Sequence, residues 1–298
     1  MAEITVALIK TLRDKTNAGM MDCKAALKET DGDLEAAETV LRKKGIADAD
    51  KKAGRAAKEG VIASRISDNG KSGVLVEVNC ETDFVAKNDN FREFVEEVID
   101  HVAAADSVDS TESVLAQPFE KDNSQTLDEF IKSKVGELGE NMALSRCVKY
   151  TTPGEGVVAT YIHMQGKVGV LVEVGTEKAA TVENDTFQQF VKDLTLHIAA
   201  SSPICLKRDE VPADLVEKEK DIFRDQMKDK PAEMIDRIIE GKMGKFYSNN
   251  CLLEQAFVKD TDKSIGDLAE EVGKGVDDTI TIARFERYAV GEGAEGEA

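Results

Sequence analysis

An internal repeat constrains this 298-residue chain more than any other feature of its sequence. Residues 73–105 (GVLVEVNCETDFVAKNDNFREFVEEVIDHVAAA) align without a gap to residues 169–201 (GVLVEVGTEKAATVENDTFQQFVKDLTLHIAAS), and 15 of the 33 aligned positions are identical. Residues 60–66 (GVIASRI) match residues 156–162 (GVVATYI) at the same offset, because 156 − 60 = 169 − 73 = 96. So many identities at one constant offset exceed chance, and the repeat therefore predicts two related structural units.

Each copy of the repeat predicts a β-hairpin followed by a long helix, since two apolar, strand-like runs precede a helical pattern. A two-stranded hairpin is only marginally stable by itself, so each copy should recruit a further strand. The candidates are residues 142–150 and 279–288. We therefore expect an α+β fold whose core consists of two repeated subdomains with antiparallel sheets, residues 60–150 and residues 151–290.

The first 45 residues predict a small module of three helices. Apolar residues recur there at helical spacing in three short runs, which are separated by breaks that contain Gly or Asp. Asp33 is the expected N-cap of the third helix, and Gly45 is its expected end. Residues 46–59 are rich in alanine and charge, have few large apolar side chains and predict a linker, which can be helical in part.

Residues 211–246 interrupt the second copy and predict a hairpin of two helices. The segment is highly charged, and apolar residues such as Leu215 and Ile222 recur seven positions apart. Pro231 divides the segment and suits the first turn of the second helix. The hairpin therefore predicts a projecting antiparallel arm. Residues 291–298 (GEGAEGEA) predict a disordered acidic tail.

Charge and cysteine usage exclude several classes of protein. The formal net charge of 39 − 58 = −19 argues against nucleic acid as the main partner, because phosphate binding needs clustered Lys and Arg. The five cysteines are scattered and form no Cys-x-x-Cys pair, which argues against a zinc or disulfide framework. No apolar stretch approaches the ~18 residues of a membrane span, and no signal peptide pattern opens the chain. We therefore expect a cytoplasmic protein.

The three histidines offer no catalytic constellation. His101 and His197 are 197 − 101 = 96 residues apart, so they occupy equivalent places in the two copies and are expected to serve the fold. His163 lies in a hairpin turn without an accompanying nucleophile or carboxylate, so it is expected to contact a partner or simply form the turn. No phosphate-binding loop of the G-x-x-x-x-G-K-[ST] type occurs. We therefore expect no enzymatic activity, metal or cofactor.

One short stretch, CETDFVAKND at residues 80–89, breaks the similarity of the two copies. At the offset of 96, Asp83 and Phe84 correspond to Ala179 and Ala180. The shared fold therefore does not require an aromatic ring at this position, and Phe84 is expected to be exposed for a partner. Asp83 is open to two interpretations, because its carboxylate can cap the loop backbone or act on a partner.

Three long motifs resemble the elongation factor Ts family of bacteria. They are LRDKTNAGMMDCKAALKETDGDLEAAETVLRKKG near the N-terminus, NCETDFVAKND in the first repeat, and VEKEKDIFRDQM with KPAEMIDRIIEGKMGKF in the interruption. RFERYAVGEG also resembles the last core strand of that family, so the resemblance extends from about residue 1 to residue 293. It implies a ubiquitin-associated-like module, two related α+β subdomains and a coiled-coil arm.

The resemblance also implies a function and a set of contact residues. Elongation factor Ts is the guanine-nucleotide exchange factor of elongation factor Tu, has no catalytic group and binds no nucleotide itself. Thr82, Asp83, Phe84 and Val85 would intrude near the magnesium site of the GTPase, with Phe84 as a wedge between two helices. Further implied contacts are Leu12, Arg13, Met20, Met21 and Lys24 in the N-terminal module and His163 in the second subdomain.

Two other interpretations of the sequence stay open. The first is a binding scaffold without exchange activity, such as a dimeric adaptor that uses the arm at residues 211–246. The second is an enzyme that uses His163 or a cysteine, although no group of catalytic residues supports it. The sequence does not fix the oligomeric state, because a helical hairpin can fold on itself, pair with a second copy or touch a partner.

Overall fold

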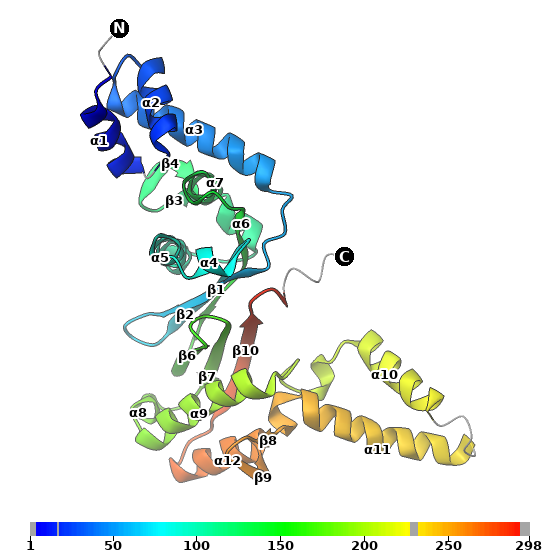
Figure 1. Ribbon diagram of the computed structural model, residues 1–298. Coiled ribbons are helices and arrows are strands. Elements are labelled where there is room, and N and C mark those ends of the chain that lie inside the picture. The colour runs from blue at the N-terminus through cyan, green and yellow to red at the C-terminus, as the bar shows by residue number, and fades with distance from the viewer. Residues whose placement is uncertain (1–3, 17, 227–231, 293–298) are drawn as a thin grey trace.

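A computed structural model describes residues 4–16, 18–226 and 232–292. For residues 232–236 it describes the backbone alone. Figure 1 shows a helical module at the N-terminus, two sheets that meet near the centre, and two helices that project from the second subdomain. Within these described residues no helix is long and apolar enough to cross a membrane. The mixture of helices and antiparallel sheets confirms the predicted α+β class.

The N-terminal module consists of α1 (Val6–Thr16), α2 (Met20–Glu29) and α3 (Leu34–Lys52) around a small apolar core. Asp33 caps α3 as predicted, because its carboxylate accepts a hydrogen bond of 3.0 Å from the Ala36 amide. The predicted end of α3 at Gly45 is wrong. The helix continues to Lys52, so the first part of the predicted linker at residues 46–59 is helical.

The length of α3 has a packing reason. Its middle crosses α7 (Leu127–Leu138) of the first subdomain. A Cβ atom on Gly136 would lie 2.6 Å from the Cα atom of Gly45, so the close approach of the two backbones requires glycine at position 136. A Cβ atom on Gly45 would make only ordinary contacts, at 3.5 Å or more. Gly45 therefore lies at a helix crossing rather than at a helix end.

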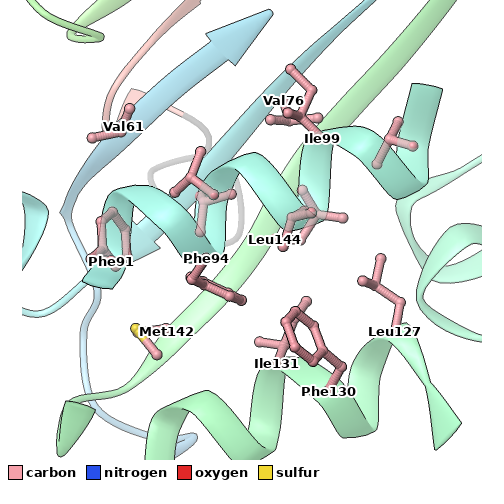
Figure 2. Close-up of a cluster of buried hydrophobic side chains, with 14 of the residues drawn as sticks. Val61, Val76, Phe91, Phe94, Ile99, Leu127, Phe130, Ile131, Met142 and Leu144 are labelled. Carbon is pink, nitrogen blue, oxygen red and sulfur yellow. The ribbon is translucent and has the colours of Figure 1, made fainter. Parts of the chain in front are cut away.

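The first subdomain places two helices over one face of a three-stranded antiparallel sheet. The sheet order is β1 (Glu59–Ile66), β2 (Ser72–Cys80) and β5 (Met142–Thr151), so residues 142–150 supply the third strand as predicted. Helix α5 (Asp89–Ala104) and α7 cover the sheet with Phe91, Phe94 and Phe130 (Figure 2). The remaining elements are α4 (Asp83–Ala86), α6 (Thr111–Leu115), β3 (Pro118–Phe119) and β4 (Asp122–Thr126).

The second subdomain repeats this arrangement. Its sheet order is β10 (Thr281–Ala289), β7 (Val168–Gly175) and β6 (Gly156–His163), which confirms the strand predicted at residues 279–288. Helix α9 (Asp185–Ser201) covers the sheet as α5 does in the first copy. The remaining elements are α8 (Ala179–Val182), the 3-10 turns η1 (Arg208–Glu210) and η2 (Leu252–Glu254), β8 (Ala256–Phe257), β9 (Asp260–Ser264) and α12 (Ile265–Gly275).

The two sheets meet through reciprocal contacts. The Ile62 amide donates to the Gly166 carbonyl at 2.7 Å, and the equivalent Val158 amide donates to the equivalent Gly70 carbonyl at 2.8 Å. Because each hairpin turn bonds the edge strand of the other copy, the interface has the self-complementary pattern of a two-fold dimer. The turn between β6 and β7 is thereby fixed against β1 of the first subdomain.

Two matched arginines complete the interface between the sheets. The Arg146 guanidinium lies 4.1 Å from the ring centre of Tyr288, and the Arg284 guanidinium lies 4.1 Å from that of Tyr150. Arg146 also pairs at 2.6 Å with the fully buried carboxylate of Glu77. The two arginine–tyrosine contacts therefore cross between the sheets, whereas the Arg146–Glu77 pair lies between β5 and β2 within the first sheet.

The predicted helical arm corresponds to α10 (Ala213–Asp225) and α11 (Ala232–Asn250), two helices in contact with each other. The second helix continues to Asn250, past the predicted limit of residue 246. The predicted break at Pro231 and residues 293–298 of the predicted tail lie outside the described residues.

Candidate functional site

The most exposed large apolar side chain among the described residues belongs to Phe84, which is 82% exposed. It lies on the single-turn helix α4, between strand β2 and helix α5 (Figure 1). The second copy forms the matching single-turn helix α8 with Ala180 at this position. The shared fold therefore forms without the ring, as the comparison of the two sequences predicts.

The loop around Phe84 is held in place by the packing of its neighbours and by hydrogen bonds. Ala86 is buried and Val85 packs against the core of the first subdomain. Thr82 is the N-cap of α4, because its hydroxyl accepts a hydrogen bond of 3.3 Å from the Val85 amide. The loop therefore presents Phe84 from a fixed base, with Val85 as part of that base rather than of the exposed surface.

A carboxylate that the sequence analysis missed binds the same loop. Glu140, in the turn after α7, accepts hydrogen bonds from the Thr82 amide at 3.0 Å and from the Thr82 hydroxyl at 2.7 Å. A signal for this residue was present, because the acids Glu140 and Asp278 occupy equivalent places before the third strand of each sheet. Two carboxylates at equivalent places in a repeat point to a shared structural task.

Asp83 forms an ion pair at the surface. Its carboxylate lies 2.6 Å from the ammonium group of Lys87, one turn along the chain. This hydrogen bond lowers the pKa of Asp83 below its ordinary value, so the carboxylate is ionised at neutral pH. Since Thr82 is the N-cap of α4, the Asp83 side chain pairs with Lys87 and is not the cap of this helix.

The contacts predicted in the N-terminal module divide into exposed and buried residues. Met20 and Met21 are 49% and 74% exposed at the start of α2, and Arg13 and Lys24 are exposed nearby on α1 and α2. Leu12 is fully buried in the core of the module, so the prediction that it contacts a partner is wrong. Its place on the inner side of α1 follows from the apolar stripe of that helix.

His163 ends strand β6 and is exposed. Its Nδ1 atom lies 2.9 Å from the Tyr161 hydroxyl, and the two rings stack with centres 5.7 Å apart. Met164, which the sequence analysis missed, follows in the left-handed conformation with a φ of 48° and is 67% exposed. An exposed methionine in a conformation that favours glycine marks this turn as a further candidate contact.

The structure brings the His163 turn to the same strand as the Phe84 loop. Gly166 of the turn bonds Ile62 on β1, and α4 also packs against β1. Lys167 pairs with Glu59 at the start of β1 at 2.6 Å. By contrast, Figure 1 shows α2, with Met20 and Met21, well separated from α4. The candidate residues therefore form two surfaces rather than one.

The other two histidines and Cys80 are buried inside the two subdomains. His101 and His197 are buried as predicted, and in each ring Nδ1 accepts a backbone hydrogen bond, at 3.2 Å from Glu120 and 3.3 Å from Val258. Burial lowers the pKa of both histidines and raises the pKa of Cys80 to about 12. Among the described residues, no three His, Cys, Asp or Glu side chains are placed to hold a metal ion. The exposed ring and charges suit contact with a macromolecule.

Comparisons with known proteins agree with this arrangement. The family model described as "Elongation factor TS" matches residues 81–292. The chain is 47% identical over 294 residues to elongation factor Ts of Trichlorobacter lovleyi, a match that covers 98% of this chain and 94% of the relative. It is 43% identical to that of Bdellovibrio bacteriovorus, with the same coverage, and 42% identical over 299 residues to that of a Nostoc species, covering 99% and 95%.

Proposed function

This chain belongs to the elongation factor Ts family, and on that premise we propose that it promotes GDP release from elongation factor Tu by disturbing the magnesium and phosphate site. The observation that carries the proposal is the exposure of Phe84, 82%, on a loop whose counterpart in the second copy has alanine. The ring is the wedge, and it enters between two helices of the GTPase. Asp83, which is ionised beside the ring, acts on the ligands of the magnesium ion.

The mechanism is thermodynamic linkage between two ligands of the GTPase. A factor that binds the nucleotide-free form more tightly than the GDP form weakens GDP binding by the same ratio. In GTPases the Mg²⁺ ion and the backbone of the phosphate loop together hold the diphosphate. Displacement of the ion leaves phosphate charge uncompensated, so the dissociation of GDP becomes faster. The wedge acts only if its contacts differ between the two states.

The second surface anchors the factor to the GTPase. The three helices of the N-terminal module act as a ubiquitin-associated-like unit, and Arg13, Met20, Met21 and Lys24 supply its contacts. Two exposed methionines suit such a surface, because their flexible side chains adapt to a partner. His163 and its turn add a contact from the second subdomain. The helices α10 and α11 form the coiled-coil arm of the family.

The partner is a protein of the cytoplasm, where translation elongation takes place, and not a nucleic acid, in line with the net charge of −19. The protein itself needs no cofactor. The decisive test measures the release of fluorescent GDP from purified elongation factor Tu with and without this protein. Acceleration at substoichiometric amounts supports exchange, whereas binding without acceleration supports the scaffold interpretation, in which the arm serves a homodimer or adaptor.

A further inference from the structure

The loop that carries Phe84 has one charged anchor from a distant part of the chain. Both oxygens of the Glu140 carboxylate are engaged with Thr82, one with its amide at 3.0 Å and the other with its hydroxyl at 2.7 Å. Hydrogen bonds to an ionised acceptor are shorter and stronger than neutral ones. Thr82 in turn caps α4, so the carboxylate, the cap and the helix that bears Phe84 form one continuous chain of contacts.

The second copy contains the same device without the wedge. Asp278 accepts from the amides of Glu177 and Lys178, both at 3.1 Å, and from the Thr181 hydroxyl at 2.5 Å. It is half-buried, as is Glu140. The anchor therefore belongs to the repeated scaffold, but in the first copy it holds a ring that faces solvent. This duplication supplies a matched control within the same molecule.

The anchor of the first copy is itself bonded to the segment that follows helix α3. The Asn141 amide donates to the Glu81 carboxylate at 2.6 Å, and the Asn141 side chain donates to the Arg55 carbonyl at 2.8 Å. Arg55, shortly after the end of α3, also pairs with Glu81 at 3.3 Å. The turn at residues 140–141 thus joins the Phe84 loop on one side to the end of the long helix α3 on the other.

We propose that Glu140 is a positioning residue for exchange, which holds α4 so that Phe84 meets the partner in one orientation. This inference rests on the proposed exchange function. Helix α4 has a single turn, and so short a helix is not stable without outside contacts. The ring is 82% exposed, so its own contacts fix it little, and its orientation depends on the base of the loop. A wedge that is ordered before binding avoids the entropy cost of ordering during binding.

The test compares Glu140→Ala, Glu140→Asp, Asp278→Ala, Phe84→Ala and the double variant of residues 140 and 84. Amide hydrogen exchange of residues 82–86 and 178–182 reports the anchors, and the rate of GDP release from elongation factor Tu reports function. We expect Glu140→Ala to speed hydrogen exchange at 82–86 and to lower kcat/KM for GDP release by about tenfold, because Thr82 loses both of its hydrogen bonds to this carboxylate. We expect Asp278→Ala to speed hydrogen exchange at 178–182 only, with GDP release within about twofold of wild type.

The double variant separates positioning from general damage. If Glu140 acts through the ring, Glu140→Ala has no further effect in the Phe84→Ala background, because the positioned group is already gone. Glu140→Asp introduces the residue type that the second copy has at this place. We expect it to restore part of the rate lost in Glu140→Ala, and it can be measured even if the alanine variant does not fold. Equal losses from Glu140→Ala in both backgrounds, or an unchanged rate, would overturn the proposal.

The two proposals fail in different ways. If wild-type protein does not accelerate GDP release, the exchange function is wrong, while hydrogen exchange at residues 82–86 still decides whether Glu140 anchors the loop. If wild-type protein is active and Glu140→Ala leaves both hydrogen exchange and GDP release unchanged, only the role of Glu140 is wrong.

Discussion

Replacement of Phe84 by alanine should separate function from stability. The ring is 82% exposed, so its removal takes almost no apolar surface out of the folded core. The second copy already has alanine at the equivalent position, Ala180, and its helix α8 still forms. Substitutions at such exposed sites change the free energy of unfolding by no more than about 0.5 kcal/mol. The melting temperature of Phe84→Ala should therefore stay close to that of wild type.

The expected loss in exchange is much larger. A phenylalanine side chain that passes from water into a protein interface gains about 1.5–3 kcal/mol. Since each 1.36 kcal/mol corresponds to a factor of ten, the loss of this term lowers kcat/KM for GDP release by about 10- to 150-fold. A loss of this size from a single side chain is typical of an interface hot spot.

The assay follows fluorescent GDP as it leaves elongation factor Tu at several concentrations of the factor, next to thermal unfolding of the factor alone. Val258→Ala is the control, because Val258 is also apolar and 45% exposed but lies in the second subdomain, away from the proposed site. The control should leave both the rate and the melting temperature unchanged. The reasoning would be refuted if Phe84→Ala lowered the melting temperature strongly and left GDP release at the wild-type rate.

Three further predictions concern stability. Arg146→Met leaves the buried Glu77 carboxylate without its cation and should cost about 3–5 kcal/mol in urea unfolding, a loss that a second change, Glu77→Met, should partly reverse. Gly136→Ala brings a Cβ atom to 2.6 Å from the Gly45 Cα, a clash that costs about 1–3 kcal/mol, whereas the gain in helix propensity is at most about 1 kcal/mol. The variant should therefore be less stable, and a protease should cut the chain after α3 faster than in wild type. Burial lowers the pKa of His197, so the unfolded chain binds the proton first and stability is lost as pH falls below about 6.5. His197→Gln should make the unfolding free energy depend less steeply on pH between about pH 7.5 and 5.5, and the slope that remains is due to the equivalent His101.

The sequence predicts the core of this fold well because the repeat supplies an internal comparison. Alternation of apolar residues in two equivalent places predicts the hairpins, and the need to complete each sheet predicts the third strands at residues 142–150 and 279–288. The cap at Asp33 is also predictable, because it depends on neighbours within one turn. Such features depend on local pattern and so can be read from one sequence.

The errors arise where a residue serves a distant contact. Gly45 resembles a helix end in sequence, but it lies within α3, at the point where Gly136 of α7 approaches its backbone. Leu12 belongs to a motif associated with partner binding, but its side chain fills the core of the module. Glu140 and Thr82 are 58 residues apart, and although the equivalence of Glu140 and Asp278 points to a shared task, nothing in the sequence indicates that Glu140 meets Thr82. Contacts of this kind depend on the tertiary arrangement and become visible only in the structure.

Not every difference between the two copies of this loop points to a partner. Thr82 corresponds to Lys178, but both copies anchor this position: the Thr82 hydroxyl bonds Glu140, and the Lys178 amide bonds Asp278. That difference changes how the loop is anchored and needs no partner to explain it.

The charged pair beside the ring is a weaker candidate than the ring itself. Asp83 and Lys87 correspond to Ala179 and Glu183, so the second copy lacks both members of the pair. An exposed pair at this spacing is screened by water and supports a helix only weakly, so its loss would be tolerated in either copy. Phe84 is different, because no anchor, cap or core contact of the first copy accounts for a ring that is 82% exposed. If the charge of Asp83 matters for exchange, it does so through its position beside that ring, and Asp83→Asn should then reduce GDP release in wild type but not in the Phe84→Ala background.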